Sequence, residues 1–312
     1  MYLESLVVDT ILDFDLYIML GRKITLYRSK QLPFTEQTKQ KLIENNVTKL
    51  FIPATAKKEF QKYVEANLTG ILQNPMIQEN KKAGIIYDTS KALVKDILAN
   101  PSNGENIQRS KDLVANQVSF ILSGREAFVN LLKITSFDYY TYTHSVNVCT
   151  FTIALANQLG IKDKVALRCL GLGALLHDIG KSRISERILN KHSTLNRAEF
   201  EIVKKHPAWG EEILRESNLI DEDAYYPVIQ HHERMDGSGY PRGLSGKEIH
   251  YYGRIIAICD VFDALTTRRV YQKELASFSA FKMMYDTKHI FDKRILKEFT
   301  LLMGPENYTS VI

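Results

Sequence analysis

The sequence has few cysteines and no long apolar segment at its N-terminus. Only three of its 312 residues are cysteine, and none forms a Cys-x-x-Cys pair. This excludes a disulfide scaffold and a zinc ribbon, and it favours a reducing compartment. The apolar residues near the N-terminus are interrupted by Asp9, Asp13 and Asp15, so we predict neither a signal peptide nor a membrane span there. We therefore expect a cytoplasmic protein.

Charge of one sign is not in large excess either. The formal net charge is +5 at pH 7, with charged residues at 25% and hydrophobic residues at 45% of the chain. These proportions are typical of a globular protein, and the length predicts about two domains. A charge of this size fits an anionic small ligand as well as nucleic acid, so it does not identify the partner.

The N-terminal part has the pattern of a small α/β domain. We expect two short strands, a helix and a third strand in this order, over residues 14–20, 24–27, 35–45 and 49–52. Pro53 should end the last strand, because proline donates no hydrogen bond to a ladder. We assign this domain to residues 1–70 and expect it to be regulatory.

A helical linker should join this domain to the rest of the chain. Helical patterns cover residues 78–99 and 107–123, and a cluster that contains proline and glycine separates them. We therefore assign residues 71–126 to a linker that couples the two domains.

The remaining part, residues 127–312, has the pattern of an all-helical domain. Apolar residues recur at helical spacing, and no strand signal is strong. Asp163 should cap a helix, and Asn196 with Glu199 has the pattern of a capping box. The helix that follows should break or kink at Pro207. The chain is thus predicted to be mainly α, with a helical bundle preceded by the small α/β domain.

All eight histidines lie in this helical domain, and several stand next to acidic residues or to one another. The groups that could hold a metal ion are the pair His177–Asp178, the pair His231–His232, and Asp260 within an apolar segment. A buried isolated carboxylate is costly, so Asp260 needs a metal ion, a cation or several hydrogen bonds. Imidazole and carboxylate suit iron, manganese or zinc. The adjacent pair at 177–178 cannot point along one helix face, so it would serve one metal from two directions or two metals.

Ordinary structural roles compete with metal binding at each position. A single histidine on an apolar helix, such as His144 or His206, is more often a core residue than a ligand. Asp260 could instead pair with Arg254 or Arg268. The histidines without an acidic or imidazole neighbour at ligand spacing are assigned no role; they are His192, His250 and His289.

Two longer segments favour the metal site. Residues 177–181, His-Asp-Ile-Gly-Lys, resemble the signature of the HD superfamily of metal-dependent phosphohydrolases. Residues 231–241, His-His-Glu-Arg-Met-Asp-Gly-Ser-Gly-Tyr-Pro, resemble the HH…DGxGYP signature of its HD-GYP branch. Further pieces of the same pattern follow the family's order, at residues 140–145, 189–191, 205–207 and 254–269. The resemblance covers about residues 127–302.

The resemblance implies a helical core around two or three metal ions, with iron first and manganese as the alternative. The implied ligands, carried over position by position, are His144, His177, Asp178, His206, His231, His232 and Asp260. Asp178 would bridge the metals. Members with a third metal resemble one another in having a glutamate where this chain has Tyr140, so two ions are expected here.

The resemblance also implies an activity, the hydrolysis of cyclic di-GMP to linear pGpG, to GMP or to both by a hydroxide that bridges the metals. Lys181 would face a phosphate oxygen, and Asp263 would orient a ligand or the water; both are predicted catalytic residues. Arg269 would reach the second phosphate. Gln272 stands where many members have a basic residue that contacts the substrate. We therefore predict substrate contacts for Lys181, Arg269 and Gln272.

The Gly-Tyr-Pro loop at residues 237–241 is expected to support the end of the His231–His232 helix, and it could also dock a diguanylate cyclase. No nucleic-acid or membrane partner is expected, while an oligomer is possible. Two other functions stay open. One is phosphohydrolysis of another nucleotide, and the other is a metal-loaded receptor or scaffold that binds a cyclic dinucleotide with little turnover, which Gln272 favours slightly.

Overall fold

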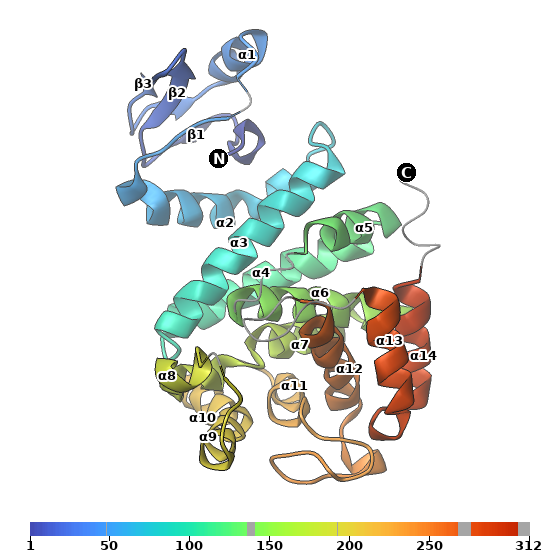
Figure 1. The fold of residues 1–312 in the computed structure, drawn as a ribbon. Helices are drawn as coiled ribbons and strands as arrows, with labels where there is room; N and C mark the ends of the chain where they lie inside the picture. Colours follow the sequence, from blue (N-terminus) through green and yellow to red (C-terminus); the bar gives the residue numbers. More distant parts are fainter. Residues whose placement is uncertain (48, 136–140, 192, 268–275, 305–312) are drawn as a thin grey trace. The chain divides into compact units, whose positions relative to one another are not determined.

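The computed structural model describes residues 1–47, 49–135, 141–191, 193–267 and 276–304 of the chain (Figure 1). The chain divides into two compact units, over residues 1–89 and 90–312. Helices predominate and strands are few, which confirms the mainly α prediction. The domain boundaries expected at residues 70 and 126 stay predictions.

The N-terminal unit begins with short antiparallel strands. Strand β1 (Thr10–Ile11) pairs with β4 (Pro33–Phe34), and β2 (Leu16–Leu20) pairs with β3 (Lys23–Arg28). Helices α1 (Glu36–Glu44) and α2 (Lys57–Gln73) follow. The Thr35 side chain accepts a hydrogen bond from the Thr38 backbone and caps α1. The first two predicted strands and the predicted helix are therefore confirmed.

The prediction of a third strand at residues 49–52 is wrong. Lys49 and Phe51 form isolated bridges to two different partners, Tyr2 and Tyr17, so no continuous ladder can form. Leu50 lies between them and is buried in the apolar core of the unit. The apolar pattern of this segment therefore reflects burial of a crossing chain rather than a strand.

Helix α2 has no counterpart in the prediction. Its buried residues Val64, Leu68 and Ile71 recur at helical spacing. No side chain caps its first turn, since the N-cap residue is Ala56. The start signal that sequence patterns depend on is therefore missing.

Long helices follow. α3 covers Glu79–Ala99 and α4 covers Gly104–Leu122, which confirms both helical patterns of the linker. The later helices are α5 (Arg125–Ile134), α6 (Thr141–Gln158), α7 (Lys164–Leu176), α8 (Glu186–Leu189), α9 (Arg197–Val203), α10 (His206–Ser217), α11 (Tyr225–Gln230), α12 (Tyr251–Thr266), α13 (Ser277–Asp286) and α14 (Lys293–Leu302). Short 3-10 turns lie at Leu3–Ser5, Ala54–Ala56, Ile179–Arg183, Glu222–Ala224, Gly246–Glu248 and Lys288–Ile290. Among the described residues no strand follows β4, and no helix has both the length and the hydropathy needed to cross a membrane.

The predicted helix ends are confirmed in the helical unit. Asp163 accepts a hydrogen bond from the first turn of α7. Asn196 and Glu199 form a capping box at the start of α9. The helical conformation is interrupted between α9 and α10, and α10 begins at His206 with Pro207 as its second residue. Proline fits there because the first backbone N–H groups of a helix have no partner within it.

Helix α6 lies at the centre of the bundle. Its residues from 143 to 156 are all buried, and α4, α7 and α12 pack around it. Helix α11 packs in turn against α7, α10 and α12. Phe151 of α6 contacts Phe262 of α12 edge to face, with ring centroids 5.8 Å apart. This packing fixes the helices from which the candidate site is built.

Gly180 allows the turn after α7 to approach the start of α10. A Cβ atom at this position would lie 2.0 Å from the backbone oxygen of His206 and 2.6 Å from the backbone nitrogen of Gly210. Only glycine fits this gap. The glycine of the His-Asp-Ile-Gly-Lys segment therefore brings Asp178 and His206 close together.

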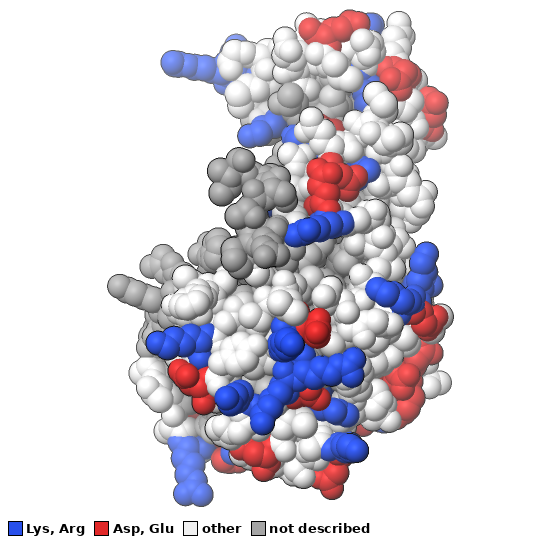
Figure 2. All heavy atoms as spheres, turned by 90° about the vertical axis from the view of Figure 1, so that its right-hand side faces the viewer, with Lys and Arg blue, Asp and Glu red and all other residues white. Residues whose placement is uncertain are grey.

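Charged side chains are unevenly spread on one face of the molecule. Figure 2 shows a group of basic side chains in the lower half of the view, on the side where α13 and α14 lie. The sequence of α14 begins Lys293-Arg294 and continues to Lys297.

Candidate metal centre

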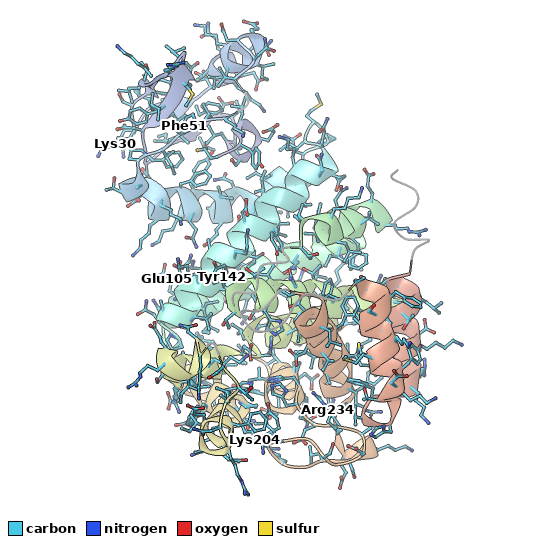
Figure 3. All side chains as sticks on the ribbon, in the orientation of Figure 1. Lys30, Phe51, Glu105, Tyr142, Lys204 and Arg234 are labelled. Carbon is cyan, nitrogen blue, oxygen red and sulfur yellow. The ribbon has the colours of Figure 1, made fainter. Side chains whose placement is uncertain are left out.

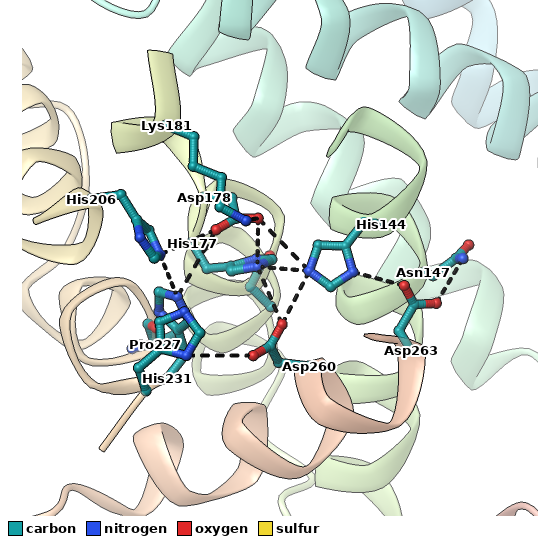
Figure 4. A network of polar contacts seen from close by, with 12 residues as sticks. His144, Asn147, His177, Asp178, Lys181, His206, Pro227, His231, Asp260 and Asp263 are labelled. Carbon is teal, nitrogen blue, oxygen red and sulfur yellow. Dashed lines mark hydrogen bonds and ion pairs between the residues drawn. The ribbon is translucent and has the colours of Figure 1, made fainter. Parts of the chain in front are cut away.

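The predicted metal ligands converge inside the helical bundle (Figure 4). They come from the first turns of α6 and α10, the ends of α7 and α11 and the middle of α12; they are His144, His206, His177, Asp178, His231, His232 and Asp260. All are buried except His232, whose side chain is 20% exposed. Residues separated by more than a hundred positions in the sequence thus share one interior site.

The end of α7 explains how two adjacent residues both face this site. His177 keeps helical backbone angles, whereas Asp178 has φ −97° and ψ 7° and precedes the 3-10 turn Ile179–Arg183. The change of helix type turns the two side chains toward the site from different directions. Two adjacent residues of one regular helix could not both face the site, so this change is what allows both to be ligands.

One set of donor atoms belongs to His144, His177 and Asp260. The Nε2 atoms of the two histidines are 3.3 Å apart, and Nε2 of His144 lies 3.0 Å from Oδ1 of Asp260. Nε2 of His177 lies 3.9 Å from the same oxygen. All three donor atoms lie within 4.8 Å of one another, which is close enough for one ion to contact all of them.

A second set belongs to His206, His231 and His232. The Nε2 atoms of His206 and His231 are 3.0 Å apart. The ring of His232 lies 5.0 Å from that of His206 and 4.2 Å from that of His231, centroid to centroid. The donor atoms of this set also lie within 4.8 Å of one another. The bundle therefore holds two neighbouring groups of possible ligands.

Asp178 lies between the two sets and turns one carboxylate oxygen toward each. Its Oδ2 is 3.4 Å from Nε2 of His177 and 3.7 Å from Nε2 of His144. Its Oδ1 is 3.3 Å from Nε2 of His206 and 4.0 Å from Nε2 of His231. A carboxylate in this position has the geometry of a bridge between two cations.

The hydrogen bonds of the histidine rings leave lone pairs pointing into the site. Nδ1 of His177, His206 and His231 each lies 2.7–2.9 Å from a backbone carbonyl oxygen of the preceding turn. A carbonyl only accepts hydrogen bonds, so each Nδ1 carries the hydrogen and each neutral ring has its lone pair on Nε2. Facing Nε2 atoms at 3.0 and 3.3 Å then repel one another unless a cation lies among them.

Asp178 gives a second reason to place a cation here. Its Oδ1 is buried and has no hydrogen-bond donor among the described residues. A buried carboxylate oxygen without a partner is costly. Carboxylate and neutral imidazole are both ligands of first-row divalent metals. The residues present therefore fit a metal centre.

The two carboxylates of the site are held in their charged state. Burial alone would raise the pKa of Asp178, but the ammonium group of Lys181 acts against burial, and this pKa lies well below its usual range. The pKa of Asp260 also lies well below its usual range, although burial alone would raise it. Both carboxylates are thus available to bind a cation near neutral pH.

The imidazoles of the second set are held in their neutral state. Burial lowers the pKa of His206 to about 4, although the nearby Asp178 acts to raise it. Burial also holds the pKa values of His231 and His232 well below the usual range of histidine. Neutral rings have a free lone pair, which metal binding requires.

Lys181 and Asp263, the predicted catalytic residues, both lie against predicted ligands. Nζ of Lys181 donates a hydrogen bond of 2.6 Å to Oδ2 of Asp178, and its side chain is 17% exposed. Oδ2 of Asp263 accepts a hydrogen bond of 2.7 Å from Nδ1 of His144, and Oδ1 accepts one of 2.8 Å from Asn147. Asp263 therefore orients the His144 ring, whereas Lys181 stands between the site and solvent.

Two residues of the site are absent from the sequence prediction. Asn147 lies one turn after His144 on the same face of α6, and this spacing is the signal that could have identified it. Glu233 follows His232 directly and is buried, and its carboxylate accepts hydrogen bonds from the backbone of Arg242 (2.7 Å) and Leu244 (3.0 Å). Glu233 could have been identified from the sequence because it lies within the signature segment 231–241.

The Gly-Tyr-Pro loop packs against the second set. The Tyr240 ring stacks on His232, with centroids 4.6 Å apart and planes at 27°. The Tyr240 backbone also donates a hydrogen bond of 3.2 Å to the His232 carbonyl. A Cβ atom on Gly239 would lie 2.5 Å from that carbonyl oxygen, so this close approach needs glycine. The loop thus supports His232 from outside.

Other residues named in the sequence analysis lie away from the site or outside the described residues. Those outside are Tyr140, His192, Arg268, Arg269 and Gln272. Arg254 pairs with Asp292 at 3.2 Å rather than with Asp260. His250 caps α12, and His289 is exposed at 3.8 Å from Asp236.

Residues 126–295, more than half of the chain, match the HD domain family. The chain is 35% identical over 229 residues to the cyclic di-GMP phosphodiesterase PA4108 of Pseudomonas aeruginosa. The matched region covers 73% of this chain and 55% of that protein. It is 40% identical over 150 residues to the 3′3′-cGAMP-specific phosphodiesterase 3 of Vibrio cholerae. That matched region covers 48% of this chain and 32% of that protein.

A solved structure has a similar fold. Bd1817, an HDG"Y"P protein from Bdellovibrio bacteriovorus, superposes with a TM-score of 0.68 over 97% of this chain and 99% of that chain, at 24% identity. The chain spans about half of PA4108 and about a third of the Vibrio cholerae enzyme. The matched range 126–295 contains both the His-Asp segment and the Gly-Tyr-Pro segment. The chain therefore belongs to the HD domain family and, within it, to the HD-GYP branch.

Proposed function

We propose that this chain is a phosphodiesterase that hydrolyses cyclic di-GMP at a centre of two divalent metal ions. The observation that carries the proposal is the position of Asp178, whose oxygens lie 3.4 Å from His177 and 3.3 Å from His206. This arrangement supports two ions that share one carboxylate, as in two-metal phosphodiester hydrolysis. The substrate is supported by the name of a relative, the cyclic di-GMP phosphodiesterase PA4108.

Two divalent ions at this centre would lower the pKa of a water molecule and neutralise charge on a phosphate group. The ligands would be the two sets already described, with Asp178 between them. Asp263 keeps the hydrogen of His144 on Nδ1, so that Nε2 faces the centre. Burial of these residues excludes bulk water and strengthens every electrostatic interaction at the site.

Positive charge at the border of the centre would bind the substrate phosphates. Lys181 carries a compact ammonium charge next to Asp178 and is partly exposed. We assign it the phosphate nearest the metal ions, since lysine binds phosphate as a point charge. Arg269 would reach the second phosphate, and Gln272 would contact the substrate as well.

Iron is the proposed metal, with manganese as the alternative, because imidazole and carboxylate together suit both. We further propose that the protein acts in the cytoplasm, that residues 1–70 are regulatory and that residues 71–126 couple them to the catalytic domain. The Gly-Tyr-Pro loop is a proposed docking site for a diguanylate cyclase, and an oligomer is compatible with this arrangement.

The activity is tested with the full chain loaded with iron or manganese in the absence of oxygen. Cyclic di-GMP and 3′3′-cGAMP are supplied separately, and chromatography separates the products. We expect conversion of cyclic di-GMP to pGpG or GMP, with loss of turnover in His177→Ala. The matched control is His289→Ala, because that ring is exposed and lies outside the centre. Elemental analysis should find two ions per chain.

Binding of cyclic di-GMP without any product would contradict the hydrolase proposal and support a receptor. Cleavage of another nucleotide together with inertness toward cyclic di-GMP would contradict the substrate. A wild-type chain that holds only one ion would contradict the bridging role of Asp178.

A further inference from the structure

An exposed aromatic ring and a lysine lie next to the metal centre without a role in it. Phe200 on α9 is 44% exposed. Nζ of Lys204, one helical turn further, lies 5.0 Å from the centroid of the Phe200 ring and 5.9 Å from that of the Tyr240 ring. Lys204 is labelled in Figure 3. Because the Tyr240 ring stacks on His232, these contacts lead from the protein surface to a predicted metal ligand.

The short helix α9 holds Phe200 in a fixed place. Asn196 and Glu199 close its capping box, and the Glu199 carboxylate also accepts a hydrogen bond of 2.5 Å from Lys191. Two residues separate the end of this helix from His206, the first residue of α10 and a member of the second ligand set. A ring that is exposed and also rigidly positioned loses little entropy when a flat ligand stacks on it.

The charge of Lys204 is available to an anionic ligand. Its ammonium pairs with Glu201 at 2.9 Å, and the two side chains are 32% and 57% exposed. An ion pair this exposed contributes little to stability, so a phosphate could replace the carboxylate at small cost. Aromatic rings flanked by basic side chains are the usual means by which proteins bind unpaired nucleobases.

We infer that Phe200 and Lys204 form an outer subsite for a nucleotide substrate, in which the ring stacks on a purine base and the lysine binds a phosphate of the same ligand. This inference rests on the proposed function, because it assumes that the scissile phosphate lies at the metal centre. A purine dinucleotide diester suits the subsite, since it carries a flat base and a second negative charge beyond the bond that is cleaved.

The competing explanation is that Lys204 only covers the exposed face of Phe200, as lysine stems often cover apolar surface. The two explanations predict different effects of removing the ring. A base platform contributes to substrate affinity, whereas a covered surface residue contributes to folding stability alone.

The test compares Phe200→Ala, Phe200→Tyr and Lys204→Ala with the wild type, using the metal-loaded full chain. KM and kcat for cyclic di-GMP and its Kd by equilibrium titration are the readouts. Loss of base stacking should raise KM and Kd roughly tenfold in Phe200→Ala, with kcat within about twofold. Phe200→Tyr should restore wild-type affinity. Lys204→Ala should weaken binding and reduce its salt dependence.

Matched controls lie elsewhere in the helical unit. Phe278→Ala removes a ring that is 81% exposed on α13, and Lys164→Ala removes an exposed charge from the first turn of α7. Neither should change KM. Unchanged KM and Kd in Phe200→Ala, with a wild type that turns over cyclic di-GMP, would overturn the subsite alone. A metal-loaded wild type that neither binds nor cleaves cyclic di-GMP would overturn the proposed function and the subsite with it.

Discussion

Replacement of Glu233 by glutamine should loosen the Gly-Tyr-Pro loop from the metal centre. The Glu233 carboxylate is buried and accepts one backbone hydrogen bond on each oxygen, from Arg242 at 2.7 Å and from Leu244 at 3.0 Å. The same loop places Tyr240 on the ring of His232. Glu233 therefore acts on the second ligand set through the loop, as a positioning residue.

The expected cost follows from these two hydrogen bonds. Each hydrogen bond to a buried charged group contributes about 1.5–3 kcal/mol, and a neutral one about 1 kcal/mol. Glutamine keeps one acceptor oxygen but turns its NH2 group toward the second backbone N–H, which loses its partner. The free energy of unfolding should therefore fall by about 2–4 kcal/mol, a large share of the 5–15 kcal/mol that is typical of a domain.

Urea denaturation of the metal-free chain measures this cost without a contribution from bound ions. Trp209, the only tryptophan, lies on α10 three residues after His206 and reports unfolding of the helical unit by fluorescence. The matched control is Glu248→Gln in the 3-10 turn Gly246–Glu248 that follows the loop, because that carboxylate is exposed while it accepts hydrogen bonds of 2.9 Å from the backbone and hydroxyl of Ser245. It should cost less than about 1 kcal/mol.

The metal-loaded chain gives the second readout, since Glu233→Gln should also weaken metal binding at His232. Equal losses of stability in Glu233→Gln and Glu248→Gln would refute the argument, because burial would then make no difference. Unchanged metal affinity with a large loss of stability would show that the loop is held by Glu233 but does not position the ligand.

Four further changes have measurable consequences. Asp263→Asn should weaken metal binding about 10- to 100-fold, because an amide can donate to His144 and reverse its tautomer; an unchanged Mn²⁺ titration would contradict this. Gly180→Ala should cost about 1–3 kcal/mol or more in urea denaturation, because its Cβ would lie 2.0 Å from a backbone oxygen. By contrast, Gly84→Ala in α3, where a Cβ meets nothing within 4 Å, should stabilise the chain by about 0.5–1 kcal/mol. Removal of metal by a chelator should lower Tm, since ions at 100 times their Kd contribute about 2.7 kcal/mol; a Tm independent of metal concentration would argue against the centre.

The elements that local sequence patterns define were predicted well. The capping box at Asn196 and Glu199, the break at Pro207 and the long helices α3 and α4 each depend on residues within a few positions of one another. The two failures lie where this condition does not hold. Helix α2 lacks a capping residue, and within residues 49–52 Leu50 is buried by partners far away in the sequence.

The sequence by itself determined the kinds of ligand, their confinement to the helical part and the family signature that groups them. It could not determine which atoms face one another, because the ligands come from helices whose contacts are set by packing around α6. Only the tertiary structure placed the two oxygens of Asp178 toward different imidazole sets and joined Asp263 to His144 across more than a hundred residues. Short segments of the sequence identify the residue types of a site, whereas distances of about 3 Å between remote side chains depend on how the whole core packs.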